Sequence, residues 1–245
     1  MTTAPAPTPA PTPAPAPAPA PVTVRSRVAE LATAHITQWQ KGYLSDRPKD
    51  VAALARLRRG AGRDAAEMPD LWALVDTGPL HARTDGLRAL SEQELSRAED
   101  ALYTALTLWA LHQQSRGTGM HRSHTRERPA GLGAAVRRLM PPGDIDDPVR
   151  KRLVRAGTAP DLVSLAQRLR DIVVLLRRAD VPLDYGLLAG QLYAWQWPGG
   201  PGAVRREWGR SFHTGQQAQP AGEDTAGTSA SPTTTDTDTD DKDAS

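Results

Sequence analysis

Arginine is the residue type whose placement in this chain points most clearly to chemistry. Pairs and triplets of basic residues recur at the ends or on the outer faces of predicted helices: Arg58-Arg59, Arg137-Arg138, Arg150-Lys151-Arg152 with Arg155, Arg177-Arg178 and Arg205-Arg206. Arginine keeps its charge at any biological pH, and its planar fork of donors fits phosphate. A chain that repeats this arrangement on successive helices is predicted to hold a polyanion.

The helix predicted after Pro148 separates its basic side chains from its apolar ones. At about 100° per residue, Lys151, Arg152 and Arg155 fall on one face with no acid between them, and Val154 falls on the other. An ordinary solvated face normally mixes both signs of charge. We therefore interpret this face as one that contacts phosphate, with a plain solvated surface as the alternative.

Arg58 and Arg59 form a second candidate site at the end of an earlier helix. Arg58 lies four residues after Leu54 and so on the apolar side, whereas Arg59 lies toward the polar side. Arg58 either extends past the core to solvent or points at a partner, and the two together could bracket one nucleic-acid strand. Arg83, in a connection, and Arg168, at the edge of a long apolar stripe, would extend this track.

The motifs of known catalytic sites are missing. The sequence contains no Gly-x-x-x-x-Gly-Lys phosphate loop, no Gly-x-Ser-x-Gly nucleophile elbow and no His-Glu-x-x-His zinc motif. It has no cysteine, which excludes disulfides and thiol catalysis. His121 and His124 lack the third and fourth neighbouring ligands that a metal ion needs. We expect no enzyme activity, no metal and no cofactor.

Tryptophans offer surfaces on which nucleic-acid bases could stack. Trp72, Trp109 and Trp208 lie on apolar stripes and are predicted to belong to the core, whereas Trp195 and Trp197 are left unassigned. With one Phe and four Tyr, the chain lacks the dense aromatic surface of modules that read single-stranded sequence. This composition favours contacts to the nucleic-acid backbone without base readout.

Composition divides the chain of 245 residues into three parts. Residues 1–22 are almost entirely Ala, Pro and Thr and are predicted to form a disordered arm. Residues 214–245 are predicted to form a disordered acidic tail, because they hold too little apolar surface to fold. Residues 23–213 remain for an all-helical domain.

The net charge of +2 conceals an asymmetry between these parts. Residues 25–213 hold 29 Lys and Arg against 21 Asp and Glu, a net charge of +8, whereas the tail holds seven acids against Lys242, a net charge of −6. A basic body favours nucleic acid or an acidic surface as its partner. The tail either competes weakly for the same basic face or only aids solubility.

Apolar residues recur at helical spacing throughout residues 23–213, and no segment alternates as a strand would. Ser91 and Glu94 form a capping box before the clearest helix. We predict an all-α protein of about nine helices in one or two abutting bundles, with residues 117–130 as an exposed loop. The chain lacks a run of about 18 apolar residues and an apolar signal core, so we expect a cytoplasmic protein that does not contact membranes.

Five stretches occur in a characteristic order: LARLRRG at 54–60, LYTALTLWALHQQ at 102–114, GLGAAVRRL at 131–139, RLVRAGTAPDLVSLAQRL at 152–169 and VPLDYGLLAGQLYAW at 181–195. The first is followed by a Pro-x-Leu-Trp segment. This ordered set, over roughly residues 24–213, resembles the CasB family, the small subunit of the type I-E CRISPR surveillance complex, Cascade. The arm and the acidic tail lie outside the resemblance.

The resemblance implies a non-enzymatic helical subunit that acts in antiviral defence. Two copies would lie side by side in the complex, so the implied partners are a second copy, the other Cascade subunits, CRISPR RNA, and the target and displaced DNA strands. Basic residues would stabilise the guide–target duplex and the displaced strand. The family's basic positions correspond here to Arg58, Arg59, Arg155 and Arg168, and less directly to Arg83.

One basic position of the family is Thr158 in this chain. The resemblance therefore implies that the contact there is weakened or moved, with Arg152 as the candidate replacement. The alternative to a nucleic-acid-binding subunit is a helical protein scaffold or regulator whose arginines pair with acidic partners. A helix-turn-helix repressor comes third, because no helix presents a set of polar base-reading residues, and an enzyme comes last.

Overall fold

The structure, a computed structural model, describes residues 23–64, 67–82 and 88–217. The predicted arm at residues 1–22 lies outside the described residues, as do residues 218–245 of the predicted acidic tail and Arg83. The last helix continues to Gln217, past residue 213 where the domain was expected to end.

The described residues form ten α-helices and one short 3₁₀ turn. In chain order they are α1 (Val24–Leu44), α2 (Pro48–Leu57), η1 (Arg58–Gly60), α3 (Pro69–Trp72), α4 (Gly78–His81), α5 (Glu92–Gln113), α6 (Leu132–Arg137), α7 (Asp147–Gly157), α8 (Leu162–Arg178), α9 (Tyr185–Trp195) and α10 (Gly200–Gln217). The predicted all-α fold is confirmed, and each predicted helix is present. The single turn of α4 was not expected, because four residues are too few to show a helical period.

Local signals set the ends of most helices. Ser91 and Glu94 form the predicted capping box at the start of α5. Helices α1, α7, α8 and α9 likewise begin at a side chain that accepts a hydrogen bond from the first turn: Thr23, Asp146, Asp161 and Asp184. Such caps satisfy backbone N–H groups that have no partner inside the helix.

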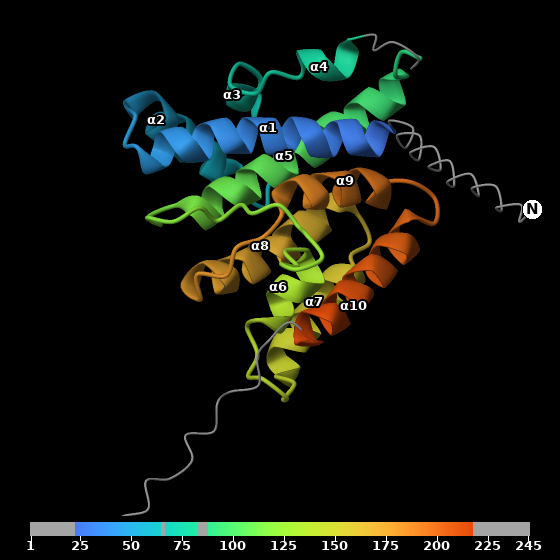
Figure 1. Cartoon of the computed structure of the whole chain (residues 1–245). Helices are drawn as coiled ribbons and strands as arrows, with labels where there is room; N and C mark the ends of the chain where they lie inside the picture. The colour runs from blue at the N-terminus through green and yellow to red at the C-terminus, as the bar shows by residue number, and fades with distance from the viewer. Residues whose placement is uncertain (1–22, 65–66, 83–87, 218–245) are drawn as a thin grey trace, which may run out of the picture.

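Helix α5 runs through the middle of the fold (Figure 1). Helices α1, α2, α8 and α9 and the turn η1 all pack against it. Leu102, Leu106 and Trp109 are fully buried, and so are Ala101 and Ala105 on the same helix. A helix covered on several sides needs apolar residues around most of its circumference, which explains the dense apolar sequence of this segment.

Helices α1–α5 lie in the upper half of the view and α6, α7 and α10 in the lower half, with α8 and α9 between them (Figure 1). Gly186 and Gly190 on α9 allow α1 to approach closely, since a Cβ at Gly186 would overlap Thr33 Oγ1 and one at Gly190 would lie 3.1 Å from the Arg25 carbonyl oxygen. One hydrophobic cluster includes residues from both halves. The described helices therefore share a single core. None of them is both long enough and apolar enough to cross a membrane.

The segment 117–130 is not the wholly exposed loop that its polar sequence predicted. Met120 and Ala130 are buried, and the segment runs beside the chain that leads into α9. The Leu183 N–H donates to the Met120 carbonyl oxygen (3.0 Å), and the His124 N–H donates to Asp184 Oδ2 (2.6 Å). Part of the loop is buried because the start of α9 supplies partners for its backbone.

Candidate nucleic-acid interface

Helices α7 and α8 enclose a groove on the surface of the protein. They are joined by the short connection 158–161 and pack against each other. The groove has a volume of about 540 Å³. It is lined by Arg152 and Arg155 of α7 and by Arg168, Arg170, Asp171, Val174 and Leu175 of α8.

Two of the groove arginines are held in place by backbone carbonyl groups. Arg168 Nη1 donates a hydrogen bond to the carbonyl oxygen of Arg155 (2.5 Å), which links α8 to α7. Arg152 Nη1 donates to the carbonyl oxygen of Pro148, one turn earlier on α7 (3.2 Å). A guanidinium has five N–H donors, so each of these side chains keeps donors for a ligand.

The positive charge in the groove is not neutralised by the described part of the chain. None of the four guanidiniums forms an ion pair with a described acid, and Asp171 is the single acid in the lining. The pKa of Asp161, at the start of α8, lies below its usual range, first because Ser164 donates hydrogen bonds to it and then because Arg168 is near. The groove therefore suits a ligand that brings its own negative charge, and a phosphate group matches the bidentate geometry of arginine.

Arg58 and Arg59 are both exposed in η1, so Arg58 does not lie on the apolar side that helical periodicity predicted. Helix α2 ends at the buried Leu57, and the tighter 3₁₀ turn that follows changes the direction of the next side chains. The turn leads to Gly62, where a Cβ would lie 3.0 Å from Arg170 Cδ. The η1 segment therefore adjoins the groove at Arg170.

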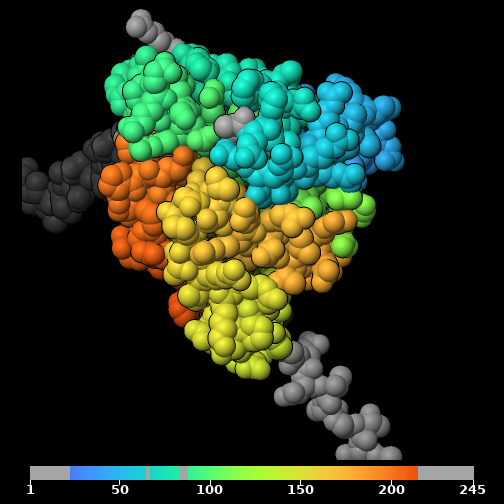
Figure 2. Space-filling view, turned by 180° about the vertical axis from the view of Figure 1, so that it is seen from behind, coloured from blue at the N-terminus to red at the C-terminus, as the bar shows by residue number. Residues whose placement is uncertain are grey.

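Figure 2 shows this face of the molecule, with the surface of α7 and α8 in yellow and gold directly below the region between α2 and α3 in cyan. The fold thus brings two predicted sites together on one side: the arginines of the groove and the segment that follows Arg58 and Arg59. Arg170 was not predicted. Arg170 lies two residues after Arg168 and so on a different part of the helix surface. Only the packing of α7 against α8 shows that both side chains line the groove.

Lys151 lies next to the groove arginines in sequence but already has a partner. Lys151 Nζ is 3.7 Å from Asp147 Oδ2, and Arg150 Nη2 is 2.7 Å from Asp147 Oδ1. No acid lies between Lys151, Arg152 and Arg155, but Asp147 lies one turn earlier on the same surface and pairs with Lys151. Val154, expected on the covered side of α7, is 54% exposed.

In the pair Arg137-Arg138, the first side chain is buried inside the fold and the second is partly buried. Arg137 is fully buried and donates to the carbonyl oxygen of Pro141 (3.0 Å). Arg138 donates to the carbonyl oxygens of Pro129 (3.0 Å) and Pro182 (2.9 Å), and burial lowers its pKa. These two arginines join loop segments to the end of α6, so they are not available to a polyanion.

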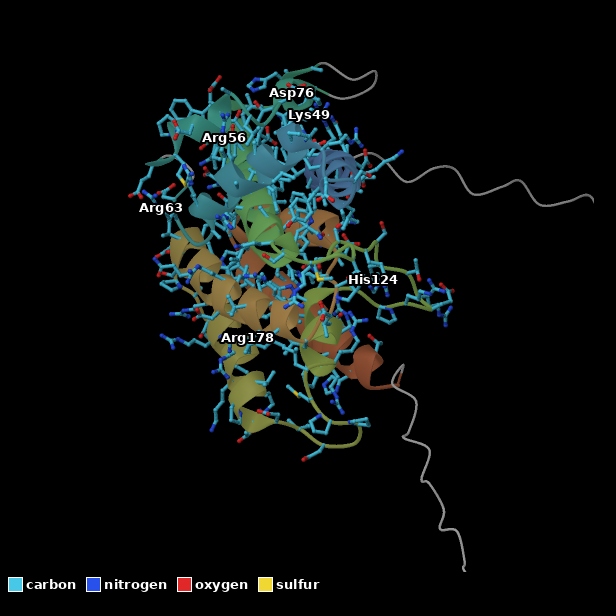
Figure 3. The ribbon with its side chains drawn as sticks, turned by 90° about the vertical axis from the view of Figure 1, so that its left-hand side faces the viewer. Lys49, Arg56, Arg63, Asp76, His124 and Arg178 are labelled. Carbon is cyan, nitrogen blue, oxygen red and sulfur yellow. The ribbon has the colours of Figure 1, made fainter. Side chains whose placement is uncertain are left out.

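Other basic side chains are spread more widely. Arg177 Nε donates to the Gln114 carbonyl oxygen (3.0 Å), so it joins α8 to the end of α5. Figure 3 shows Lys49, Arg56 and Arg63 in the upper half of the molecule and Arg178 in the lower half, and all four are exposed. The arginines on α7 and α8, by contrast, line a common groove.

Most of the tryptophans belong to the core. Trp109 and Trp208 are buried as predicted, and Trp195 stacks on Trp208 with ring centroids 5.6 Å apart. Trp197 is partly buried and carries the guanidinium of Arg97 at 4.0 Å from its ring centroid. Trp72 was expected in the core but is 59% exposed, because α3 is a single turn that buries Leu71 on its other side.

His121 and His124 support the fold rather than a metal site. His121 Nδ1 accepts a hydrogen bond from the Tyr185 N–H (3.2 Å), and His124 Nδ1 accepts one from the Ala130 N–H (3.1 Å). Among the described residues, no group of three or more His, Asp or Glu side chains is arranged to hold a metal ion.

A second, smaller cavity of about 110 Å³ lies between α5 and the start of α8. Asp100 and Asp64 line it together with Arg63 and Thr104. The pKa of Asp100 is raised to about 6, mainly by burial and further by the charges of Asp64 and Glu99. The cavity is too small for a nucleotide, and its acids affect the pH dependence of stability.

The fold and the groove define the class of protein: a helical, basic protein that presents several arginines in one groove between two helices. Comparison with known families is consistent with this class. The sequence model of the family described as CRISPR-associated protein Cse2 matches residues 53–213. The chain belongs to the Cse2 family, and the predicted resemblance is confirmed.

Similar solved structures include the following two. The crystal structure of CasB from Thermobifida fusca is 47% identical, with a TM-score of 0.67, over 76% of this chain and 98% of that one. A chain of a structure described as a CRISPR RNA-guided surveillance complex is 24% identical, with a TM-score of 0.54, over 78% of this chain and 95% of that one. This second likeness concerns the fold alone. No curated protein sequence matches the chain.

Proposed function

We propose that this protein is a non-catalytic small subunit of a type I-E CRISPR RNA-guided surveillance complex, Cascade, in antiviral defence. Its membership of the Cse2 family supports this proposal. Its partners would be the other subunits of the complex, a second copy of itself, CRISPR RNA, and the target and displaced DNA strands. It would act in the cytoplasm.

The observation that carries the proposal is the groove between α7 and α8, where four arginines meet a single acid. Arginines that contact phosphates release condensed counterions, and this binding needs no base readout. Formation of an R-loop exchanges two duplexes of similar stability, so a few additional backbone contacts can shift the balance. The groove, with Arg58 and Arg59 beside it, would supply such contacts to the guide–target duplex or to the displaced strand.

A variant that combines Arg58→Ala, Arg59→Ala, Arg155→Ala and Arg168→Ala tests the proposal. These side chains make few contacts within the described fold, so the variant should fold and assemble into the complex. We expect the lifetime of the R-loop to shorten. The salt dependence of binding should weaken by a slope of about 0.7–0.9 for each phosphate that the variant no longer binds. An unchanged R-loop lifetime in the assembled complex would contradict the proposal.

Arg150→Ala is the matched control, because Arg150 is an exposed arginine of the same helix that is already paired with Asp147. Its R-loop lifetime should stay close to that of the unmodified complex. The same measurements address the alternative of a protein scaffold for acidic partners. A scaffold would show little nucleic-acid binding even at low salt, and its arginine variants would fail to assemble.

A further inference from the structure

The chain continues beyond α10 with a strongly acidic segment. Residues 218–245 contain seven acids against the single Lys242, a net charge of −6. The acids are Glu223, Asp224, Asp236, Asp238, Asp240, Asp241 and Asp243. The last five of these acids lie within the eight residues 236–243, which also contain Lys242. This short stretch therefore has a high density of negative charge.

The groove between α7 and α8 has the opposite charge. Its four guanidiniums have one acid among them and no ion pair with the described part of the chain. Like charges held this close repel one another in the absence of an anion. An anionic segment of the same chain would relieve this repulsion whenever no other polyanion occupies the groove.

The position of α10 makes the contact reachable. Near its start, Arg205 Nη1 donates to the carbonyl oxygen of Gly157 at the end of α7 (3.2 Å), and α10 then packs along α6 (Figure 1). From Arg205 to Gln217 the helix rises about 18 Å at about 1.5 Å per residue. At no more than about 3.3 Å per residue, the chain from Gln217 spans up to about 20 Å to Glu223 and up to about 60 Å to Asp236. The dense group of acids from Asp236 to Asp243 therefore has enough chain to reach back to the groove.

We propose that the acidic segment 218–245 binds in the arginine groove between α7 and α8 of the free protein and competes there with the nucleic-acid backbone. The competition rests on the function proposed above, whereas the contact between segment and groove does not. The segment would suppress binding to unselected RNA and DNA. It would leave the groove when the protein joins a complex that presents nucleic acid at high local concentration.

The expected effect is moderate because the segment is a weak but tethered competitor. A tether of this length gives an effective concentration on the order of 1 mM. If the segment binds the groove with a dissociation constant of roughly 0.5 mM, the apparent affinity for nucleic acid falls about threefold. Both contacts are electrostatic, so the difference should disappear at high salt.

The first experiment compares the full chain with a full-length variant whose tail is neutral. This variant carries Glu223→Gln and Asp→Asn at 224, 236, 238, 240, 241 and 243, so length and polarity are kept. Binding of a single-stranded oligonucleotide is measured at low and at high salt. We expect the neutral-tail variant to bind about threefold more tightly at low salt and equally at high salt. Equal affinities at low salt would overturn the competition.

The second experiment detects the contact itself without nucleic acid. The chain has no cysteine, so Thr239→Cys gives a single site for a nitroxide spin label within the dense group of acids. We expect the label to broaden the amide NMR signals of α7 and α8 around Arg155 and Arg168. The broadening should be absent from the neutral-tail variant with the same label and from a variant with all four groove arginines changed to Gln.

The two experiments separate failure of this inference from failure of the proposed function. Broadening at the groove with no binding of any oligonucleotide would support the contact and contradict the proposed function. Absence of broadening at the groove would overturn the inference, whatever the oligonucleotide does. Broadening spread evenly over the surface would also overturn it, because the tail would then act only as a solubilising segment.

Discussion

Gln191 is buried on α9 and forms hydrogen bonds with two side chains of α10. Gln191 Oε1 accepts a hydrogen bond from Trp208 Nε1 (2.8 Å), and Gln191 Nε2 donates to Glu207 Oε2 (3.0 Å). Glu207 in turn receives both terminal nitrogens of Arg25, at 2.9 and 2.6 Å. This chain of polar contacts connects α1, α9 and α10, and the buried Trp208 indole N–H depends on Gln191 for its acceptor.

The change Gln191→Ala should therefore destabilise the protein. A buried donor left without a partner costs about 1–3 kcal/mol. We expect a loss of this size in the free energy of unfolding, measured by urea denaturation. Gln93→Ala on the exposed side of α5 is the control and should change it by no more than about 0.5 kcal/mol. Equal stability of the two variants would show that the hydrogen bonds of Gln191 make no net contribution to the free energy of unfolding.

At the scale of elements, α6 and α10 approach each other closely through their backbones. A Cβ at Gly133 would overlap the carbonyl oxygen of Trp208 and lie 2.6 Å from the Phe212 backbone nitrogen. Ser211 Oγ accepts a hydrogen bond from the Ala134 N–H (3.1 Å), which fixes the register of the two helices. Backbone atoms cannot move aside as a side chain can. A side chain at Gly133 would therefore force α6 and α10 apart.

We expect Gly133→Ala to lower the free energy of unfolding by at least about 1–3 kcal/mol, the usual cost of overpacking. Gly209→Ala on α10 is the matched control. A methyl group there meets no atom within 4 Å, and alanine favours a helix over glycine by about 0.5–1 kcal/mol. Thermal unfolding should therefore shift in opposite directions for the two variants. A shift in the same direction would mean that α6 and α10 are not packed this closely in solution.

Helix α7 differs from the other long helices in how little of it is buried. Ala156 and Gly157 near its end are buried, whereas most of its other residues face solvent. It is held by α8, by the Asp146 cap and by the hydrogen bond from Arg205. The arginines of the groove thus lie on a helix that presents most of its surface to a partner.

At the scale of the whole molecule, His112 links stability to pH. It is buried with its Nδ1 2.9 Å from the Tyr185 hydroxyl. Burial lowers its pKa to about 3; a hydrogen bond with Leu176 opposes this shift, and Arg116 and Arg177 add to it. In the unfolded chain the pKa is near 6.5. The unfolded state therefore binds more protons between these values, and stability falls as the pH is lowered through this window.

As the pH falls from about 7 to about 5, protonation of His112 in the unfolded chain should lower the free energy of unfolding by about 2 kcal/mol. The variant His112→Gln should lose this component, so urea denaturation at several pH values should give it a flatter profile than the original chain. His121, whose pKa burial also lowers, contributes with the same sign and remains in the variant. Parallel profiles would contradict the assignment to His112.

Asp100 acts with the opposite sign. Its pKa is raised to about 6 in the folded state, above the ordinary value of 3.8. Its contribution to stability is therefore present at low pH and lost as the pH rises through about 6. The change Asp100→Asn should accordingly steepen the loss of stability on acidification, which separates its effect from that of His112.

Several features of the fold were predictable because they depend on near neighbours in the chain. The capping box of Ser91 and Glu94, the aspartate caps of α7 and α9, and the apolar stripe of α8 each lie within a few residues. The exposure of Arg155 on α7 follows from helical periodicity alone. The ordered stretches that indicated the family are likewise a property of the sequence, and the family model agrees.

Other features depended on which helix packs against which, and periodicity cannot supply that. Arg137 and Arg152 both lie on short basic helices, but α10 and the adjoining loops cover the first and leave the second exposed. Within the described part of the chain, no neighbour covers Trp72. Arg170 joins the groove because α7 packs against α8.

The sequence alone determined the helical fold, the starts of the capped helices and the basic character of the body, because caps, apolar period and charge are local properties. Only the tertiary structure decided which arginines are exposed, which support loops and which share the groove. Burial and electrostatic neighbourhood are set by contacts between residues far apart in the chain. The four groove arginines gain their common role from the packing of α7 against α8.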